Sequence, residues 1–166
     1  MMATIRFYQA RDAQQVGRLI AETYARFNLG FVPPDQLAAF LGPFQHAGST
    51  DPDHQAAIAA LIRADMVYVA QADGVIVGVL RGRKERLGSL FVHQDYHRQG
   101  IGRALVARFE QDSLALGVKL IRVAATQFGL PFYTALGYKK STGLRLGWSF
   151  DGHGIPIQPM RKVLAK

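Results

Sequence analysis

Hydrophobic and polar positions along the chain follow two different periods. A period of two predicts strands at 4–8, 66–72, 75–83, 86–92 and 119–125, most of them bounded by turn-forming residues. A period of three to four predicts a first helix that reaches Phe27, a second that ends at Ile62, and a third over 101–116. Strands that alternate with helices in this way are typical of an α/β fold.

Polar residues mark where several of these elements begin. Asp12 is expected to cap the first helix, and Asp51 the second, with Pro52 in its first turn. Asp73-Gly74 lies between two β-rich runs and predicts a two-residue hairpin turn. The strands on either side of that turn are therefore expected to be antiparallel neighbours.

The remaining segments have weaker patterns. Pro33-Pro34 predicts a short helical piece that ends at Leu41, and 42–52 predicts a loop. The tail predicts two strands, at about 139–147 and 157–164, joined by 151–154. Because proline cannot donate to a ladder, Pro159 is expected beside the start of the last strand or in a bulge.

The stretch 90–106 is the most informative, because its period changes in the middle. An apolar run ends at Val92, a polar turn follows, and the chain enters a helix with apolar residues four apart at Ile101, Leu105 and Phe109. Gly100 and Gly102 lie at the helix entrance, where the first backbone N–H groups have no partner within the helix. Glycines there leave room for an anionic group at the positive end of the helix dipole.

This loop predicts a phosphate site, although the Gly-x-Gly pair is also compatible with a tight turn that needs a positive φ. Leu105 stands where a dinucleotide-binding loop has its third glycine, and no Gly-Lys-Ser/Thr of a P-loop is present. The order strand, helix, strand over 86–125 predicts a βαβ crossover with parallel strands. The loop is therefore expected at the carboxyl end of a strand, where open α/β sheets bind ligands.

Composition limits the class of protein. A chain of 166 residues with 49% hydrophobic content is expected to form one domain over 1–166 and to bury about 70% of its unfolded surface. No apolar run approaches the roughly 18 residues of a membrane span, no signal peptide is visible, and cysteine is absent, so we expect a cytoplasmic protein without disulfides. The formal charge of +8 favours anionic partners, and both nucleic acid and coenzyme A phosphates satisfy it.

A second informative segment, 126–138, predicts a short helix from about Pro131 that ends at Gly137. Phe132 and Leu136 are four apart and are expected to face the core. Tyr133 is compatible with a packed aromatic whose hydroxyl is satisfied, or with a functional hydroxyl.

Together these stretches resemble the GNAT N-acetyltransferase family, over residues 88–138. The run Leu90-Phe91-Val92 followed by His97-Arg98-Gln99-Gly100-Ile101-Gly102 is similar to the family's acyl-CoA loop, with His97 in place of the usual Gln or Arg. Pro131-Phe132-Tyr133, followed by Gly137-Tyr138, is similar to the family's helix whose tyrosine points at the sulphur of the acyl donor. The resemblance implies a mixed, twisted and partly splayed sheet of about seven strands with helices on both faces.

The resemblance also implies an activity. A primary amine on a small molecule or peptide would attack the thioester of acetyl-CoA directly, and Tyr133 would donate a proton to the leaving thiolate. A backbone N–H near Val92 would stabilise the thioester oxygen. Glu85 is the nearest acidic candidate for the base, although it is also compatible with a solvated partner of neighbouring cations. The residues expected to bind the cofactor are Leu90, Phe91, Val92, His97, Arg98, Gln99, Gly100, Ile101, Gly102, Arg103, Thr126, Gln127 and Phe132.

Several alternatives stay open. The aromatic end of the first helix, with Tyr24, Phe27 and Phe31, is expected either to pack in the core or to line a substrate pocket. A nucleic-acid-binding module would suit the charge, but the basic residues are scattered along the chain. An acyl-CoA-binding fold without catalysis and a homodimer are also compatible with the sequence. We expect no metal, because the histidines at 93 and 97 fall in a loop rather than on a helix.

Overall fold

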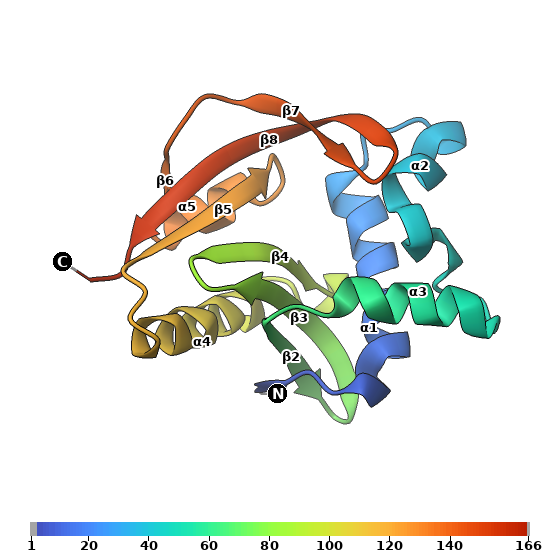
Figure 1. Cartoon of the computed structure of the whole chain (residues 1–166), viewed down its shortest axis with the longest axis horizontal. Helices are drawn as coiled ribbons and strands as arrows, with labels where there is room; N and C mark the ends of the chain where they lie inside the picture. The colour runs from blue at the N-terminus through green and yellow to red at the C-terminus, as the bar shows by residue number, and fades with distance from the viewer. Residues whose placement is uncertain (1–2, 166) are drawn as a thin grey trace.

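The computed structural model describes residues 3–165, which form one eight-stranded sheet with helices on both faces (Figure 1). Hydrogen-bonded neighbours follow the order β1-β2-β3-β4-β5-β8-β6, and β7 also pairs with β8. The strands are β1 (Thr4–Phe7), β2 (Met66–Ala72), β3 (Val75–Arg83), β4 (Arg86–Val92), β5 (Leu120–Thr126), β6 (Lys139–Lys140), β7 (Arg145–Ser149) and β8 (Gly152–Val163). All pairs are antiparallel except β4 with β5, which is parallel as predicted.

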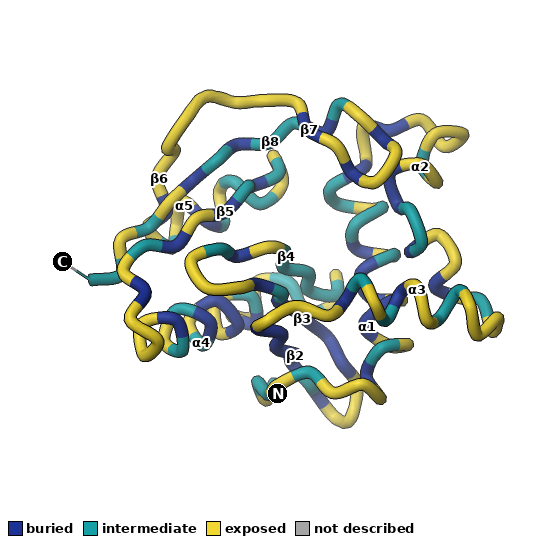
Figure 2. The backbone as a smooth tube through the Cα atoms, in the orientation of Figure 1, coloured by how far each residue is buried: buried dark blue, intermediate teal, exposed yellow. Residues whose placement is uncertain are grey.

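Five α-helices flank this sheet: α1 (Ala13–Thr23), α2 (Leu37–Leu41), α3 (Pro52–Ile62), α4 (Ile101–Ala115) and α5 (Leu130–Ala135). One apolar core joins α4 to the sheet and includes the fully buried Leu105 and Phe109. A second core, on the opposite face, joins α1 and α3 to β2 and β3 through residues such as Val16 and Ile58. Because it packs on both faces, β3 is buried along most of its length, as Figure 2 shows.

The predicted hairpin turn at Asp73-Gly74 and the predicted cap at Asp51, which begins α3, are both confirmed. Asp73 and Gly74 have φ angles of 50° and 79°, the two positive values that a tight β-hairpin turn of this kind requires. The Asp51 side chain accepts from the Asp53 N–H at 2.8 Å, with Pro52 in the first turn of α3. No helix among the described residues is both long and apolar enough to cross a bilayer.

Asp12 does not cap α1, contrary to the prediction. Its carboxylate accepts two hydrogen bonds from the Arg6 guanidinium, at 2.8 and 3.0 Å, and a third from the backbone N–H of Gln9. Asp12 is 3% exposed, so a bidentate partner and a backbone donor offset the cost of burying its charge. The Arg6 guanidinium is the main reason that the pKa of this carboxyl lies below its usual value.

The helical stripe predicted to reach Phe27 is interrupted before its end. The α-helix stops at Thr23, and the chain continues as one π-helical turn over Tyr24–Asn28. A turn of this kind rotates the side chains relative to the preceding helix, so Tyr24 and Phe27 leave the core stripe and face the site described below. The predicted loop at 42–52 also contains a 3₁₀ turn over Gly42–His46.

The tail differs most from the prediction. Instead of one strand at 139–147, the chain forms the short β6 and then β7, and β8 begins at Gly152 rather than near 157. Pro159 lies in the middle of β8 without a register shift against β5. On the β6 side its carbonyl accepts from the Ser141 N–H, one residue beyond the last pair of β6 with β8. The missing proline N–H therefore falls where the β6 ladder ends.

Candidate active site

The parallel strands β4 and β5 pair only at their beginnings. The register joins Arg86 to Arg122 and Leu87 to Val123, and no further pair is formed. Beyond these two pairs the strands diverge, as Figure 1 shows. The second half of β4 therefore has backbone groups on its β5 side that no neighbouring strand uses.

The direction of these backbone groups follows from the ladder with β3. The His93 N–H donates to the Val77 carbonyl oxygen at 2.8 Å, on the β3 side. Because successive residues of a strand point their backbone groups to opposite edges, Leu90 and Val92 direct theirs toward the gap. The Val92 carbonyl accepts from the His97 side chain, so Leu90 and the Val92 N–H form the open edge to which an extended, amide-bearing chain could hydrogen-bond.

The loop that follows β4 leads directly into α4. Arg98 and Gly100 both adopt left-handed backbone conformations, with φ angles of 61° and 82°. The first N–H groups of α4 therefore face outward, and no side chain caps them. A Cβ on Gly102 would lie 3.1 Å from the Phe132 ring, so the close approach of α4 and α5 favours glycine at that position. The predicted helix entrance is present and its first N–H groups are uncapped, while anion binding there stays a prediction.

His97 fixes the start of this loop. Its Nε2 lies 2.7 Å from the Val92 carbonyl oxygen, and because a carbonyl only accepts, Nε2 carries the hydrogen. The ring also contacts Phe27, with ring centroids 4.8 Å apart. Phe27 in turn packs against Phe128 at 4.9 Å, so one aromatic group links the turn after α1, the loop before α4 and the end of β5.

A cavity of about 1310 Å³ fills the gap between β4 and β5 and extends to α1 and β7. Its wall includes Tyr133 and all the predicted cofactor-binding residues except Gln99, which is exposed and donates from its side chain to the Asp95 carbonyl. The cavity therefore runs from the α4 entrance to an aromatic region formed by Tyr24, Phe44, Trp148 and Phe150.

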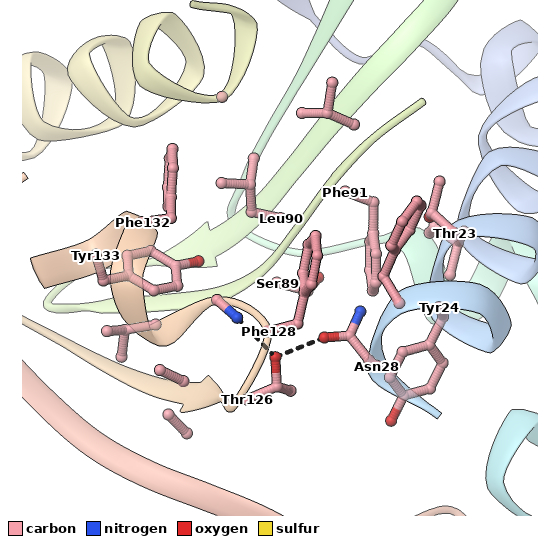
Figure 3. Close-up of a pocket in the computed structure, with 18 of the residues that line it drawn as sticks. Thr23, Tyr24, Asn28, Ser89, Leu90, Phe91, Thr126, Phe128, Phe132 and Tyr133 are labelled. Carbon is pink, nitrogen blue, oxygen red and sulfur yellow. Dashed lines mark hydrogen bonds between the residues drawn. The ribbon is translucent and has the colours of Figure 1, made fainter. Parts of the chain in front are cut away.

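The Tyr133 hydroxyl points toward the middle of this cavity from the α5 side (Figure 3). The residue is 6% exposed, and its ring is held edge-on between Phe132 and Tyr138. Burial raises the pKa of the phenol, and its hydroxyl makes no hydrogen bond to the other residues drawn in the figure. Tyr133 therefore presents a neutral O–H donor to whatever occupies the cavity.

Next to Tyr133, a polar bridge runs from the end of β5 to the turn after α1. Thr126 Oγ1, at the end of β5, donates to Asn28 Oδ1 at 2.5 Å and accepts from the Gly129 N–H at 3.3 Å. Beyond Asn28, the Tyr24 hydroxyl lies 2.5 Å from Ser149 Oγ. Ser149 uses its own hydrogen on the Phe40 carbonyl at 2.7 Å, so Tyr24 is the donor in that pair. Burial raises the pKa of Tyr24, against the effect of this hydrogen bond.

The charged side chains that line the cavity are all positive. Its wall contains Arg81, Arg98 and Arg103, and none of its residues is an aspartate or a glutamate. The Arg81 guanidinium is occupied by the carbonyl oxygens of Ile62 and Arg63 at the end of α3. Arg98 and Arg103, beside the α4 entrance, are exposed and form no ion pair with another described residue. That entrance therefore combines two free cations with a helix N-terminus, which suits a diphosphate.

The structure does not bring Glu85 to the cavity. Glu85 lies in the exposed turn between β3 and β4, with a φ of 71°, whereas the cavity wall on β4 begins at Gly88. Phe31 is exposed and also lies outside the wall, whereas Tyr24 and Phe27 line it. Among residues 3–165 no group of three or more potential ligands from His, Cys, Asp and Glu could hold a metal ion.

Part of the cavity wall was not predicted from the sequence. That part is formed by Asn28, Phe128, Trp148, Ser149 and Phe150. Trp148 and Ser149 end β7, one exposed and the other buried, and Phe150 follows that strand. Asn28 and Phe128 follow a helix and a strand, and nothing in the sequence shows that these ends meet.

Comparison with known proteins agrees with this geometry. A family model described as an acetyltransferase (GNAT) domain matches residues 47–164, well over half of the chain. A search of curated protein sequences finds no match. Among solved structures, a GCN5-related N-acetyltransferase from Rhodopseudomonas palustris is 21% identical, with a TM-score of 0.81 over 98% of this chain and 96% of that chain.

Two further solved structures are described as complexes with coenzyme A or acetyl-CoA. PaiA N-acetyltransferase from Thermoplasma acidophilum, in complex with coenzyme A, is 17% identical, with a TM-score of 0.73 over 98% of this chain and 99% of its own. YncA from Salmonella typhimurium, with its cofactor acetyl-CoA, is 16% identical, with a TM-score of 0.65 over 100% of this chain and 96% of its own. The resemblance inferred from the two motifs and the fold that it implied are confirmed: the chain belongs to the GNAT acetyltransferase family.

Proposed function

We propose that the protein is a cytoplasmic N-acetyltransferase that moves the acetyl group of acetyl-CoA to a primary amine by direct attack. The observation that carries this proposal is the neutral Tyr133 hydroxyl, which faces the gap between β4 and β5 from one side. The open backbone edge of β4 and the uncapped entrance of α4 lie on the other sides of the same cavity. A thioester with a long amide-bearing arm and a diphosphate matches this combination.

Each part of the donor has a counterpart in the wall. The N–H groups at the start of α4, with Arg98 and Arg103, would bind the diphosphate. The unpaired edge at Leu90 and Val92 would bind the amide-bearing arm, as an added strand does. The two related structures described with coenzyme A or acetyl-CoA support this assignment.

The acyl transfer then needs three groups. The amine nitrogen attacks the thioester carbonyl carbon, forming the C–N bond, and the C–S bond breaks as the tetrahedral intermediate collapses. The Val92 N–H would stabilise the negative oxygen of that intermediate. The Tyr133 O–H would supply the proton to the leaving thiolate, a contribution of about tenfold to a thousandfold. The proton lost by the amine passes to water and returns to the tyrosine from solvent.

The cavity provides no carboxylate base, because its wall contains no acidic residue and Glu85 lies outside it. We therefore propose that the small neutral fraction of the amine is the form that attacks, since the pKa of an alkyl ammonium is near 10. The aromatic region around Tyr24 and Trp148 would receive the body of the acceptor, a small amine or a peptide amine.

Release of free thiol from acetyl-CoA over a library of amines tests this proposal. We expect release that depends on both the amine and the enzyme, and N-acetylated product by mass spectrometry. Binding of coenzyme A without release by any amine would favour a catalytically silent acyl-CoA-binding protein instead. Retention on DNA without coenzyme A binding would favour the nucleic-acid-binding alternative.

A further inference from the structure

Five basic side chains form a row straight across the sheet. The register places Arg83 opposite Arg86, Arg86 opposite Arg122, Arg122 opposite Arg161, and Arg161 opposite Lys139. Residues directly opposite each other present their side chains on the same face. The row crosses β3, β4, β5, β8 and β6, and at about 4.8 Å between strands it is roughly 19 Å long.

This cationic row lies on the face away from α4. The residues next to it along the strands, Leu87, Ile121, Val123 and Met160, are buried in the core that α4 and α5 cover. Because side chains alternate, the row faces the other way, and four of its members are exposed while Arg86 is half-buried.

No negative charge within the described residues compensates the row. The five strands that carry it contain no aspartate or glutamate. None of the ion pairs among residues 3–165 involves a member of the row. Glu85 lies in the turn beside Arg83, and the register of β2 with β3 places Asp65, just before β2, next to Arg83 as well, but neither carboxylate forms an ion pair with the row. Like charges placed directly opposite each other destabilise a sheet, so the row lowers the stability of the fold. A role in stabilising the fold therefore does not explain the row.

We propose that this row binds a carboxylate-rich, extended segment of a partner polypeptide. Four of the five cations are arginines, whose planar guanidinium binds carboxylates through two parallel hydrogen bonds. An extended peptide presents alternate side chains about 6.6 Å apart, so the row spans three or four acidic side chains on one edge of such a segment.

The residues around the row favour a polypeptide over a nucleic acid. On the same face, two residues before and after Arg122 and Arg161, the strands carry Leu120, Ala124, Pro159 and Val163. These are all aliphatic, and single-stranded nucleic acids are usually held by aromatic rings on which bases stack. The row is also carried entirely by strands, whereas a duplex groove is usually entered by a helix.

The row lies next to the cavity. On β4 the cavity wall begins at Gly88, two residues after Arg86, and on β5 it begins at Val123, next to Arg122. Ile157, on the same face of β8 as Arg161, also lines the cavity. An acidic segment held by the row would therefore pass beside the cavity at its middle. The inference concerns binding alone, so it stands or falls independently of the proposed acetyl transfer.

Fluorescence anisotropy of a labelled ten-residue glutamate-rich peptide tests this assignment, with the full chain and without coenzyme A. The test variant is Arg122→Gln with Arg161→Gln. The matched control is Arg11→Gln with Arg18→Gln, which removes the same charge from two exposed arginines far from the row in the sequence. We expect the row variant to weaken binding about tenfold or more and the control to stay within about twofold, with the difference shrinking at high salt.

Thermal unfolding checks that the row variant is folded. Its midpoint should equal or exceed that of the wild type at low salt, because a pair of opposed like charges has been removed. Equal weakening in both double variants, or no binding by the wild type at low salt, would overturn the proposal. A labelled twelve-nucleotide poly-dT that binds more tightly than the peptide, and is lost only in the row variant, would replace the polypeptide with a nucleic acid.

Discussion

The imidazole Nε2 of His97 donates to the carbonyl oxygen of Val92 across 2.7 Å, which ties the loop before α4 back to the last residue of β4. The strand edge and the helix entrance are thus held at a fixed separation by one side chain. In the proposed reaction these two features bind different parts of the same donor, so their separation sets how well both are used at once.

Replacing His97 tests this positioning role. His97→Ala should raise the KM for acetyl-CoA about two- to tenfold, the effect of one lost hydrogen bond, and leave kcat within about twofold. His97→Gln can still donate to Val92 and should restore most of the affinity. Steady-state thiol release measures both constants. A large fall in kcat at unchanged KM would mean that His97 takes part in the chemistry rather than in positioning.

Removing the Tyr133 hydroxyl tests the proton donor. Tyr133→Phe should lower kcat about tenfold to a thousandfold, with coenzyme A affinity nearly unchanged, because the ring still packs between Phe132 and Tyr138. Tyr138→Phe is the matched control, since its hydroxyl donates to Glu110 and lies outside the cavity wall. The kcat of this control should equal that of the wild type. Full turnover by Tyr133→Phe would show that Tyr133 is not the proton donor.

The pH profile provides a separate test of Tyr133. Burial raises the pKa of this phenol above its ordinary value near 10, so the protonated form that donates persists at higher pH. Turnover should rise with pH as more of the amine is neutral, and it should not fall again below about pH 10. Initial rates at saturating acetyl-CoA measure this, over the range in which the enzyme stays folded. A falling limb centred near pH 8 in wild type would point to a different donor.

The pair between Arg6 and Asp12 should control stability in acid. The pKa of the Asp12 carboxyl is lowered in the folded state. The ionised carboxylate therefore stabilises the fold fully above the ordinary pKa of aspartate, and this stabilisation is lost as the pH falls through the lowered pKa. Asp12→Asn should lower the free energy of unfolding by about 2–4 kcal/mol at pH 7, with a smaller difference below about pH 4. Urea unfolding measures it, with the exposed Asp35→Asn as control. A difference that stays constant down to pH 3 would contradict this account.

The parts of the molecule that could be predicted from sequence are those in which local residues decide the structure. Asp73-Gly74 has one favoured turn, and Gly100 before an apolar period of three to four marks a helix entrance. These signals, with the two family motifs, were enough to place the central sheet, the α4 entrance and the short helix that carries Tyr133.

The rest depended on contacts between distant segments. Asp12 has the residue type of a cap, but Arg6 competes for its carboxylate with two hydrogen bonds. Asn28 becomes part of the site only because it meets Thr126, 98 positions away. Pro159 sits in the middle of β8 where the β6 ladder ends, and the place where a distant strand stops pairing has no local signal.

The most direct test of the donor site is calorimetric titration of coenzyme A into wild type, Gly100→Glu and Gly117→Glu. Both glycines have positive φ angles, 82° and 86°, at opposite ends of α4, and a Cβ on either would meet no atom within 4 Å. The two variants therefore carry similar backbone strain, but only one places a carboxylate at the proposed diphosphate site. We predict that Gly117→Glu binds like wild type and that Gly100→Glu binds at least about a hundredfold more weakly. Equal affinity in all three proteins, or no binding by wild type, would contradict the account.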